Sequence, residues 1–173
     1  MIEVFRFLLG LAAAIALHVF GLRLHGATPQ FFDPFVVLVI YGAMRSGTAQ
    51  STVSGSVVGL VQDTLTGGLY GLHGFANTAV AYLISAVRQR FVIQQPLQIA
   101  VLAALGGIFQ TSVLAFLQWA LVTGSELPEP MPGLIKMIVT GLATLAVYVG
   151  SNRLFAWDRR RRELRNSRIR LGL

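Results

Sequence analysis

The chain has 173 residues, of which 54% are hydrophobic and 12% are charged, roughly half the charged share of soluble domains. This composition leaves no room for a sizeable soluble domain and predicts an integral membrane protein. Cysteine is absent, which excludes disulfides, thiolate metal sites and cysteine nucleophiles. The net charge of +7 does not indicate a nucleic-acid partner, because eight arginines lie between Arg153 and Arg170, directly after an apolar stretch.

The first apolar stretch, residues 4–24, predicts a transmembrane helix. A signal peptide has a similar pattern, but here Glu3 balances Arg6 and the apolar run is long, so we interpret it as a retained helix. His18 and His25 are seven positions apart with no evident third ligand. We therefore expect packed or interfacial imidazoles and no metal site.

The second predicted helix spans residues 34–44. Asp33 followed by Pro34 is typical of a helix start, with Asp33 as the N-cap and Pro34 in the first turn. The segment is short for a full crossing of the bilayer. We expect it to extend, to tilt, or to be a broken helix buried among its neighbours.

A third helix is predicted over residues 48–62, and a ridge of small residues follows it at intervals of four. The ridge consists of Gly47, Ser51, Gly55 and Gly59 and ends at Asp63. Consecutive members are neighbours on one side of a helix, and small residues let a second helix approach closely. We expect the ridge to pack inside the bundle, in preference to being reserved for a partner protein.

Asp63 precedes a turn that contains Gly67, Gly68, Gly71 and Gly74. A carboxylate at membrane depth is costly and by default marks function. Asp63 could instead lie at the outer interface, where the cost is small, or cap N–H groups two or three residues later. Because glycine allows positive φ and close approach, we expect a partly inserted turn organised by Asp63. Its immediate role is structural, with binding as a consequence.

Three further helices are predicted, over residues 72–90, 97–122 and 134–155. Asn77, Gln110 and Gln118 lie within apolar segments. They would suit either the lining of a small cavity or interhelical hydrogen bonds, and we favour the hydrogen bonds.

The fold class is therefore an all-α integral membrane protein with six transmembrane helices and both termini in the cytoplasm, where most arginines then lie. Residues 1–156 form the transmembrane domain and residues 157–173 a basic cytoplasmic tail. In this tail Arg159, Arg160, Arg161 and Arg162 are expected to contact anionic lipids. No nucleotide loop, metal set or acid–base pair is evident, so we expect no catalytic residue, no cofactor and no enzyme.

Two stretches resemble the rod shape-determining protein MreD family: FDPFVVLVIYGAMRSG and VVGLVQDTLTGGLYGLHGFANTAVAYLI. The resemblance rests on a glycine–aspartate pattern that leads into an apolar helix: Gly59, Asp63, Gly67 and Gly71, followed by Leu72 and His73. Its specific part runs from Asp33 to Leu83, and the other helices match in hydropathy. Gln62 stands where the family usually has an aliphatic residue.

The resemblance implies a non-enzymatic scaffold of the bacterial cell-elongation complex in the inner membrane. It implies binding to the single-pass protein MreC, support of lateral peptidoglycan synthesis, and work with the elongation polymerase, the transpeptidase and the actin-like MreB. The implied fold is similar to the substrate-binding components of energy-coupling-factor transporters. The partner-binding or structural motif would be Gly55, Gly59, Asp63, Gly67, Gly71 and His73.

One alternative is a substrate-binding component of such a transporter, carrying a vitamin or a metal ion. Ala12 and Ala16 form a small-residue step of the kind by which these components dock on their coupling module. An alanine-rich helix also produces that spacing by chance, and the outer loops have few aromatic or polar groups for a small ligand.

Overall fold

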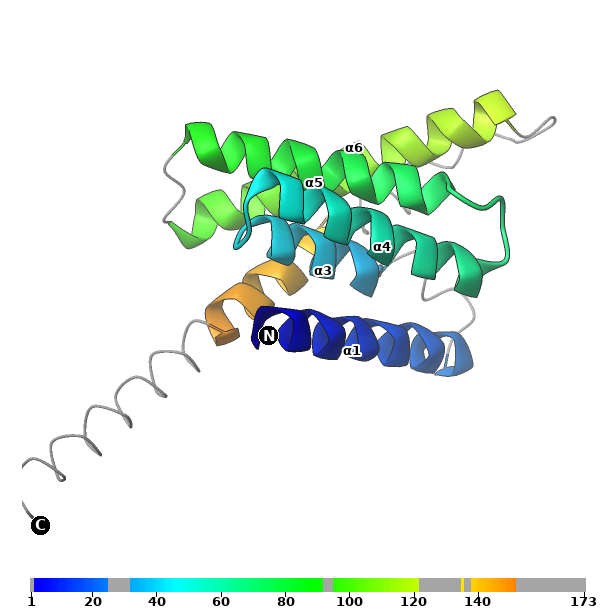
Figure 1. Ribbon diagram of the computed structural model, residues 1–173, viewed down its shortest axis with the longest axis horizontal. Helices are drawn as coiled ribbons and strands as arrows, with labels where there is room; N and C mark the ends of the chain where they lie inside the picture. The colour runs from blue at the N-terminus through cyan, green and yellow to red at the C-terminus, as the bar shows by residue number, and fades with distance from the viewer. Residues whose placement is uncertain (1, 25–31, 92–94, 122–134, 136–137, 152–173) are drawn as a thin grey trace, which may run out of the picture.

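The computed structural model describes residues 2–24, 32–91, 95–121, 135 and 138–151, and the regular structure in these ranges is entirely helical. The helices are α1 (Ile2–Leu24), α3 (Pro34–Ala43), α4 (Thr48–Thr66), α5 (Leu72–Arg90) and α6 (Pro96–Leu121), together with a final segment, Ile138–Ser151. Figure 1 shows α1 along one side of the bundle, with α3 and α4 between it and α5. Sequence reasoning predicted these helices, with ends that differ by a few residues.

The short helix α3 lies at the centre and contacts α1, α4, α5 and α6. The side chains of Phe35, Val36 and Ile40 are fully buried. Asp33 caps the first turn, since its carboxylate accepts the backbone N–H of Phe35 at 3.0 Å. A helix that packs on protein on nearly every side has no need to match the bilayer thickness. This explains how so short an apolar helix is accommodated, as a buried helix among its neighbours.

Two helices are long and apolar enough to cross a membrane, at Val4–Arg23 and Leu97–Leu121. Two others, α3 and Ile138–Ser151, are apolar but shorter. The described part of the chain is therefore consistent with a helical membrane protein, and the six-span count remains a prediction. His25, residues 122–134 and the basic tail with Arg159–Arg162 lie outside the described residues.

The two ends of the bundle carry opposite charges. Arg6, Arg45 and Arg88 come from three different segments and line one pocket. At the opposite end, Asp33 and Asp63 lie near the start of α3 and the end of α4, beside the turn that connects α4 with α5 (Figure 1). Arg6, Arg45 and Arg88 thus lie at one end and Asp33 and Asp63 at the other, although Glu3 in the first turn of α1 and Arg23 in its last turn depart from this separation.

Candidate functional site

The Asp63 carboxylate binds the first turn of the next helix. Only 1% of this residue is exposed. Its Oδ2 accepts the backbone N–H groups of Gly71 and Gly74 at 2.9 and 3.1 Å. Its Oδ1 accepts the N–H of His73 at 3.0 Å and lies 2.9 Å from the Nδ1 of the same residue. Both oxygens therefore point at the start of α5.

This geometry makes Asp63 the N-cap of a helix to which it does not belong. The α5 position that usually supplies a capping side chain is Gly71, which has none. A helix N-terminus presents unpaired N–H groups and a partial positive charge, so a carboxylate there is stabilising. The sequence-based alternative of a cap two or three residues onward is wrong. α4 continues to Thr66, and the side chain reaches N–H groups eight to eleven residues later.

The glycines of the ridge lie where α4 meets α5. A Cβ at Gly59 would overlap the carbonyl oxygen of His73 and lie 2.6 Å from the Cα of Gly74. A Cβ at Gly55 would lie 2.7 Å from the carbonyl oxygen of Asn77. Backbone atoms fill these positions, so no larger residue fits without moving a helix. The same close approach brings the end of α4 near enough to α5 for the Asp63 carboxylate to cap it.

The turn between the two helices depends on two glycines with positive φ. Gly67 has φ +66° and ends α4, donating its N–H to the carbonyl of Asp63 at 3.3 Å. Gly71 has φ +97° and begins α5. Residues with a Cβ are strained at these angles, so the spacing of Asp63, Gly67 and Gly71 has a steric origin.

A chain of buried polar side chains extends from this site across the bundle. Gln62 donates from Nε2 to Oδ2 of Asp33 at 2.9 Å and accepts from Nδ2 of Asn77 at 2.9 Å. Asn77 in turn accepts from Nε2 of Gln110 at 3.4 Å. These bonds join the cap of α3 to α4, α5 and α6. Asn77 and Gln110 thus form the interhelical hydrogen bond that the sequence favoured, whereas Gln118 is exposed.

Replacing Gln62 with leucine is expected to destabilise the bundle by about 2 kcal/mol or more, because one carboxylate oxygen and one amide N–H lose their buried partner. Unfolding of the purified protein in detergent measures this. Gln50→Leu is the matched control and should change little, because Gln50 is an exposed glutamine of the same helix as Gln62. Equal effects of the two substitutions would contradict a structural role for the Gln62 bridge.

The Asp63 turn is bordered by exposed apolar side chains. Tyr70 is 75% exposed, and Leu69 and Phe75 are also exposed. These three residues flank the N–H groups that Asp63 holds, so the cap fixes the backbone from which they project. We refer to Leu69, Tyr70 and Phe75 as the turn patch.

Comparison with known proteins identifies the family of this chain. The family model of rod shape-determining protein MreD matches residues 1–149. The chain belongs to the MreD family. No curated protein and no solved structure matches it significantly. Membership gives the chain a role in rod-shape determination in the membrane, and it accounts for the resemblance seen from Asp33 to Leu83.

For this MreD-family chain, the structure gives the motif a physical basis. Gly59 permits contact between helices, Asp63 caps α5, and Gly67 and Gly71 adopt the φ angles of the turn. Gln62 is 3% exposed and hydrogen-bonded on both sides, to Asp33 and to Asn77. Sequence reasoning missed this role, because Gln62 belongs to no local motif.

His18, Ala12 and Ala16, which the sequence also singled out, lie on α1 and not on the α4–α5 turn. His18 is buried with its ring 5.3 Å from that of Phe35, as expected of a packed imidazole. Within the described ranges, no three His, Asp or Glu side chains gather as metal ligands. Ala12 and Ala16 are exposed on α1.

Proposed function

We propose that this MreD-family protein is a non-enzymatic, multi-pass scaffold of the cytoplasmic membrane that binds MreC and supports lateral peptidoglycan synthesis. The Asp63 turn forms part of the binding surface. The observation that carries this proposal is the buried carboxylate that holds the turn patch in a fixed position. The elongation polymerase, the transpeptidase and MreB are further partners of the same complex.

A fixed apolar patch suits a scaffold because a rigid surface loses little conformational entropy on binding. Tyrosine and phenylalanine bury large areas and are enriched at the centres of protein interfaces. The turn patch lies at the carboxylate end of the bundle. The positive-inside rule assigns the opposite, arginine-bearing end to the cytoplasm and this end to the outer side. MreC would therefore meet the turn patch near the outer leaflet.

A photocrosslinking amino acid at position 70 is expected to crosslink to MreC in cells, whereas one at position 82 is not. Tyr82 is the matched control because it is also an exposed tyrosine, farther along α5. Tyr70→Ser should weaken co-purification of MreC about tenfold or more. This is the effect expected when an aromatic side chain that becomes buried at the centre of an interface is lost. The rod shape of cells carrying this substitution should be impaired.

Equal crosslinking from both positions, or normal MreC recovery with Tyr70→Ser, would contradict the assignment of the surface. The membrane level and thermal stability of each variant must match those of the unsubstituted protein. Rod-shaped cells with normal wall synthesis after deletion of the whole protein would contradict the scaffold role itself.

A further inference from the structure

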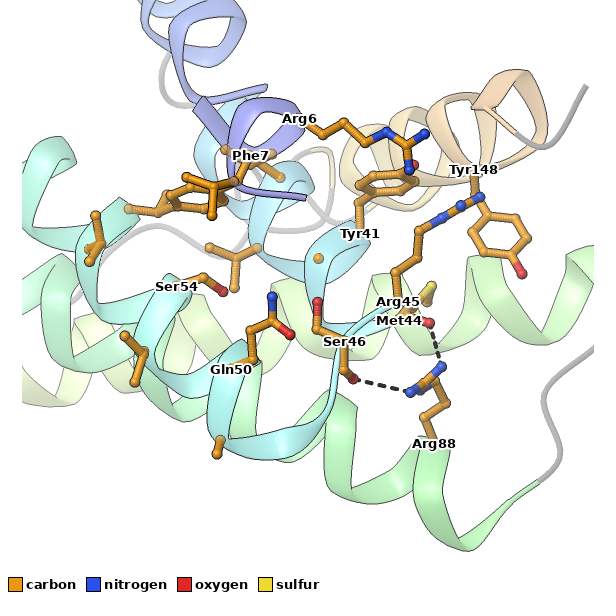
Figure 2. Close-up of a pocket in the computed structure, with 18 residues that line it drawn as sticks. Arg6, Phe7, Tyr41, Met44, Arg45, Ser46, Gln50, Ser54, Arg88 and Tyr148 are labelled. Carbon is orange, nitrogen blue, oxygen red and sulfur yellow. Dashed lines mark hydrogen bonds between the residues drawn. The ribbon is translucent and has the colours of Figure 1, made fainter. Parts of the chain in front are cut away.

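The arginine end of the bundle contains a pocket that the scaffold role does not use. Its volume is about 900 Å³, and its walls come from the start of α1, the second half of α3 and the first half of α4. Arg6, Arg45 and Arg88 line it, and Figure 2 shows them approaching from three separate elements. No carboxylate occurs among the described residues that form its walls.

The guanidinium groups of Arg45 and Arg88 are positioned by the protein. Arg88 donates from Nη1 to the carbonyl of Met44 at 2.8 Å and from Nη2 to that of Ser46 at 3.1 Å (Figure 2). The guanidinium of Arg45 lies 5.1 Å from the ring centre of Tyr41 and 5.6 Å from that of Tyr148. The Nε of Arg88 is buried and has no acceptor in the described part of the chain. This end of the pocket therefore has positive charge and an unused N–H donor.

Apart from Ser46, Gln50 and Ser54, most of the remaining wall is apolar, and it continues onto the outer surface of the bundle. Val4, Val53 and Val57 line it and are each more than 40% exposed. Leu38 and Phe7 line it as well. A soluble anion would be attracted by the positive charge of the arginines but would leave the apolar wall without a partner. An anionic amphiphile matches both parts.

We propose that this pocket binds an anionic glycerophospholipid, with its phosphate at Arg6, Arg45 and Arg88 and an acyl chain along Val53 and Val57. Basic pockets between transmembrane helices on the cytoplasmic side are typical binding sites for anionic headgroups, and positive residues mark that side. The volume lies within the range of sites for single ligands, about 300–1,000 Å³. A three-turn helix, about 10–12 Å across, requires on the order of 1,500 Å³.

The chain offers matched variants for a test. Arg45→Gln removes a cation from the pocket, whereas Arg90→Gln removes an exposed cation of α5 that does not line it. Gly42 lines the pocket, and a Cβ there meets no atom within 4 Å, so the side chain of Gly42→Phe can start into the pocket and its ring should occupy part of the space. Gly150 has equally open surroundings outside the pocket, and Gly150→Phe is its control.

The experiment is native mass spectrometry of the full chain in detergent, titrated with phosphatidylglycerol or phosphatidylcholine, with thermal stability measured in parallel. We expect saturable binding of one phosphatidylglycerol, about tenfold tighter than phosphatidylcholine. Arg45→Gln should weaken it about fivefold, the effect of one cation at a membrane surface. Gly42→Phe should abolish it, and Arg90→Gln and Gly150→Phe should bind normally.

Equal affinity for the two lipids would overturn the proposal. So would normal phosphatidylglycerol binding in folded Gly42→Phe protein. A photocrosslinker at position 53 that captures a polypeptide segment in cells, and no lipid, would also overturn it by showing that a protein occupies the groove.

Discussion

Gly59→Ala is expected to prevent the bundle from assembling stably, although it adds only one methyl group. That methyl group would overlap the carbonyl oxygen of His73 and lie 2.6 Å from the Cα of Gly74, and backbone atoms cannot rotate away. Overpacking a well-packed site typically costs about 1–3 kcal/mol, and we expect the upper end of this range or more here. Separating α4 from α5 would also remove the Asp63 cap.

Gly42→Ala is the matched control, because Gly42 also lies within a helix and a Cβ there meets nothing within 4 Å. Alanine favours helix over glycine by about 1 kcal/mol, so this substitution should stabilise the protein slightly. Unfolding in detergent and the amount of protein in the membrane measure both effects. Similar stabilities for Gly59→Ala and Gly42→Ala would contradict the tight contact between α4 and α5.

Asp63→Asn is expected to destabilise the bundle by about 2–4 kcal/mol, although asparagine has nearly the same shape. Both oxygens of Asp63 accept backbone N–H groups, Oδ1 from His73 and Oδ2 from Gly71 and Gly74. Asparagine has one accepting oxygen, and its NH₂ group would face N–H donors on the other side. Buried donors without an acceptor cost about 1–3 kcal/mol each, and the charge at the α5 N-terminus is also lost.

Thr64→Ala is the control for Asp63→Asn, since Thr64 is the exposed neighbour and its hydroxyl bonds only within its own helix. Its stability should remain within about 0.5 kcal/mol of the unsubstituted protein. MreC crosslinking from position 70 should fall with Asp63→Asn and persist with Thr64→Ala. An Asp63→Asn protein as stable as the Thr64→Ala protein would contradict the capping role of the carboxylate.

Local sequence signals predicted much of this site. Asp33 and Pro34 marked the start of α3, and the structure has the Asp33 side chain in that role. The glycines after Asp63 predicted a turn, and Gly67 and Gly71 have the positive φ that requires glycine. Such signals are reliable because caps and φ angles depend on neighbours within a few residues.

The long-range partners were not predictable in the same way. The N–H donors to Asp63 lie at the start of the next helix, and Gln62 links Asp33 with Asn77 across three elements. The arginine pocket also joins α1, α3, α4 and α5, although its arginines are far apart in sequence. These contacts depend on the rotation and separation of packed helices, and a single sequence shows the periodicity of each helix but not its pairing.

The sequence by itself determined the membrane class, the approximate helix ranges and the glycine–aspartate motif, because hydropathy and steric limits on the backbone act locally. Only the tertiary structure decided that Gly55 and Gly59 of the ridge pack on α5, that Asp63 caps that helix, and that three arginines share one pocket. The physical reason is that a buried polar group takes its partners from whichever helix packing brings near.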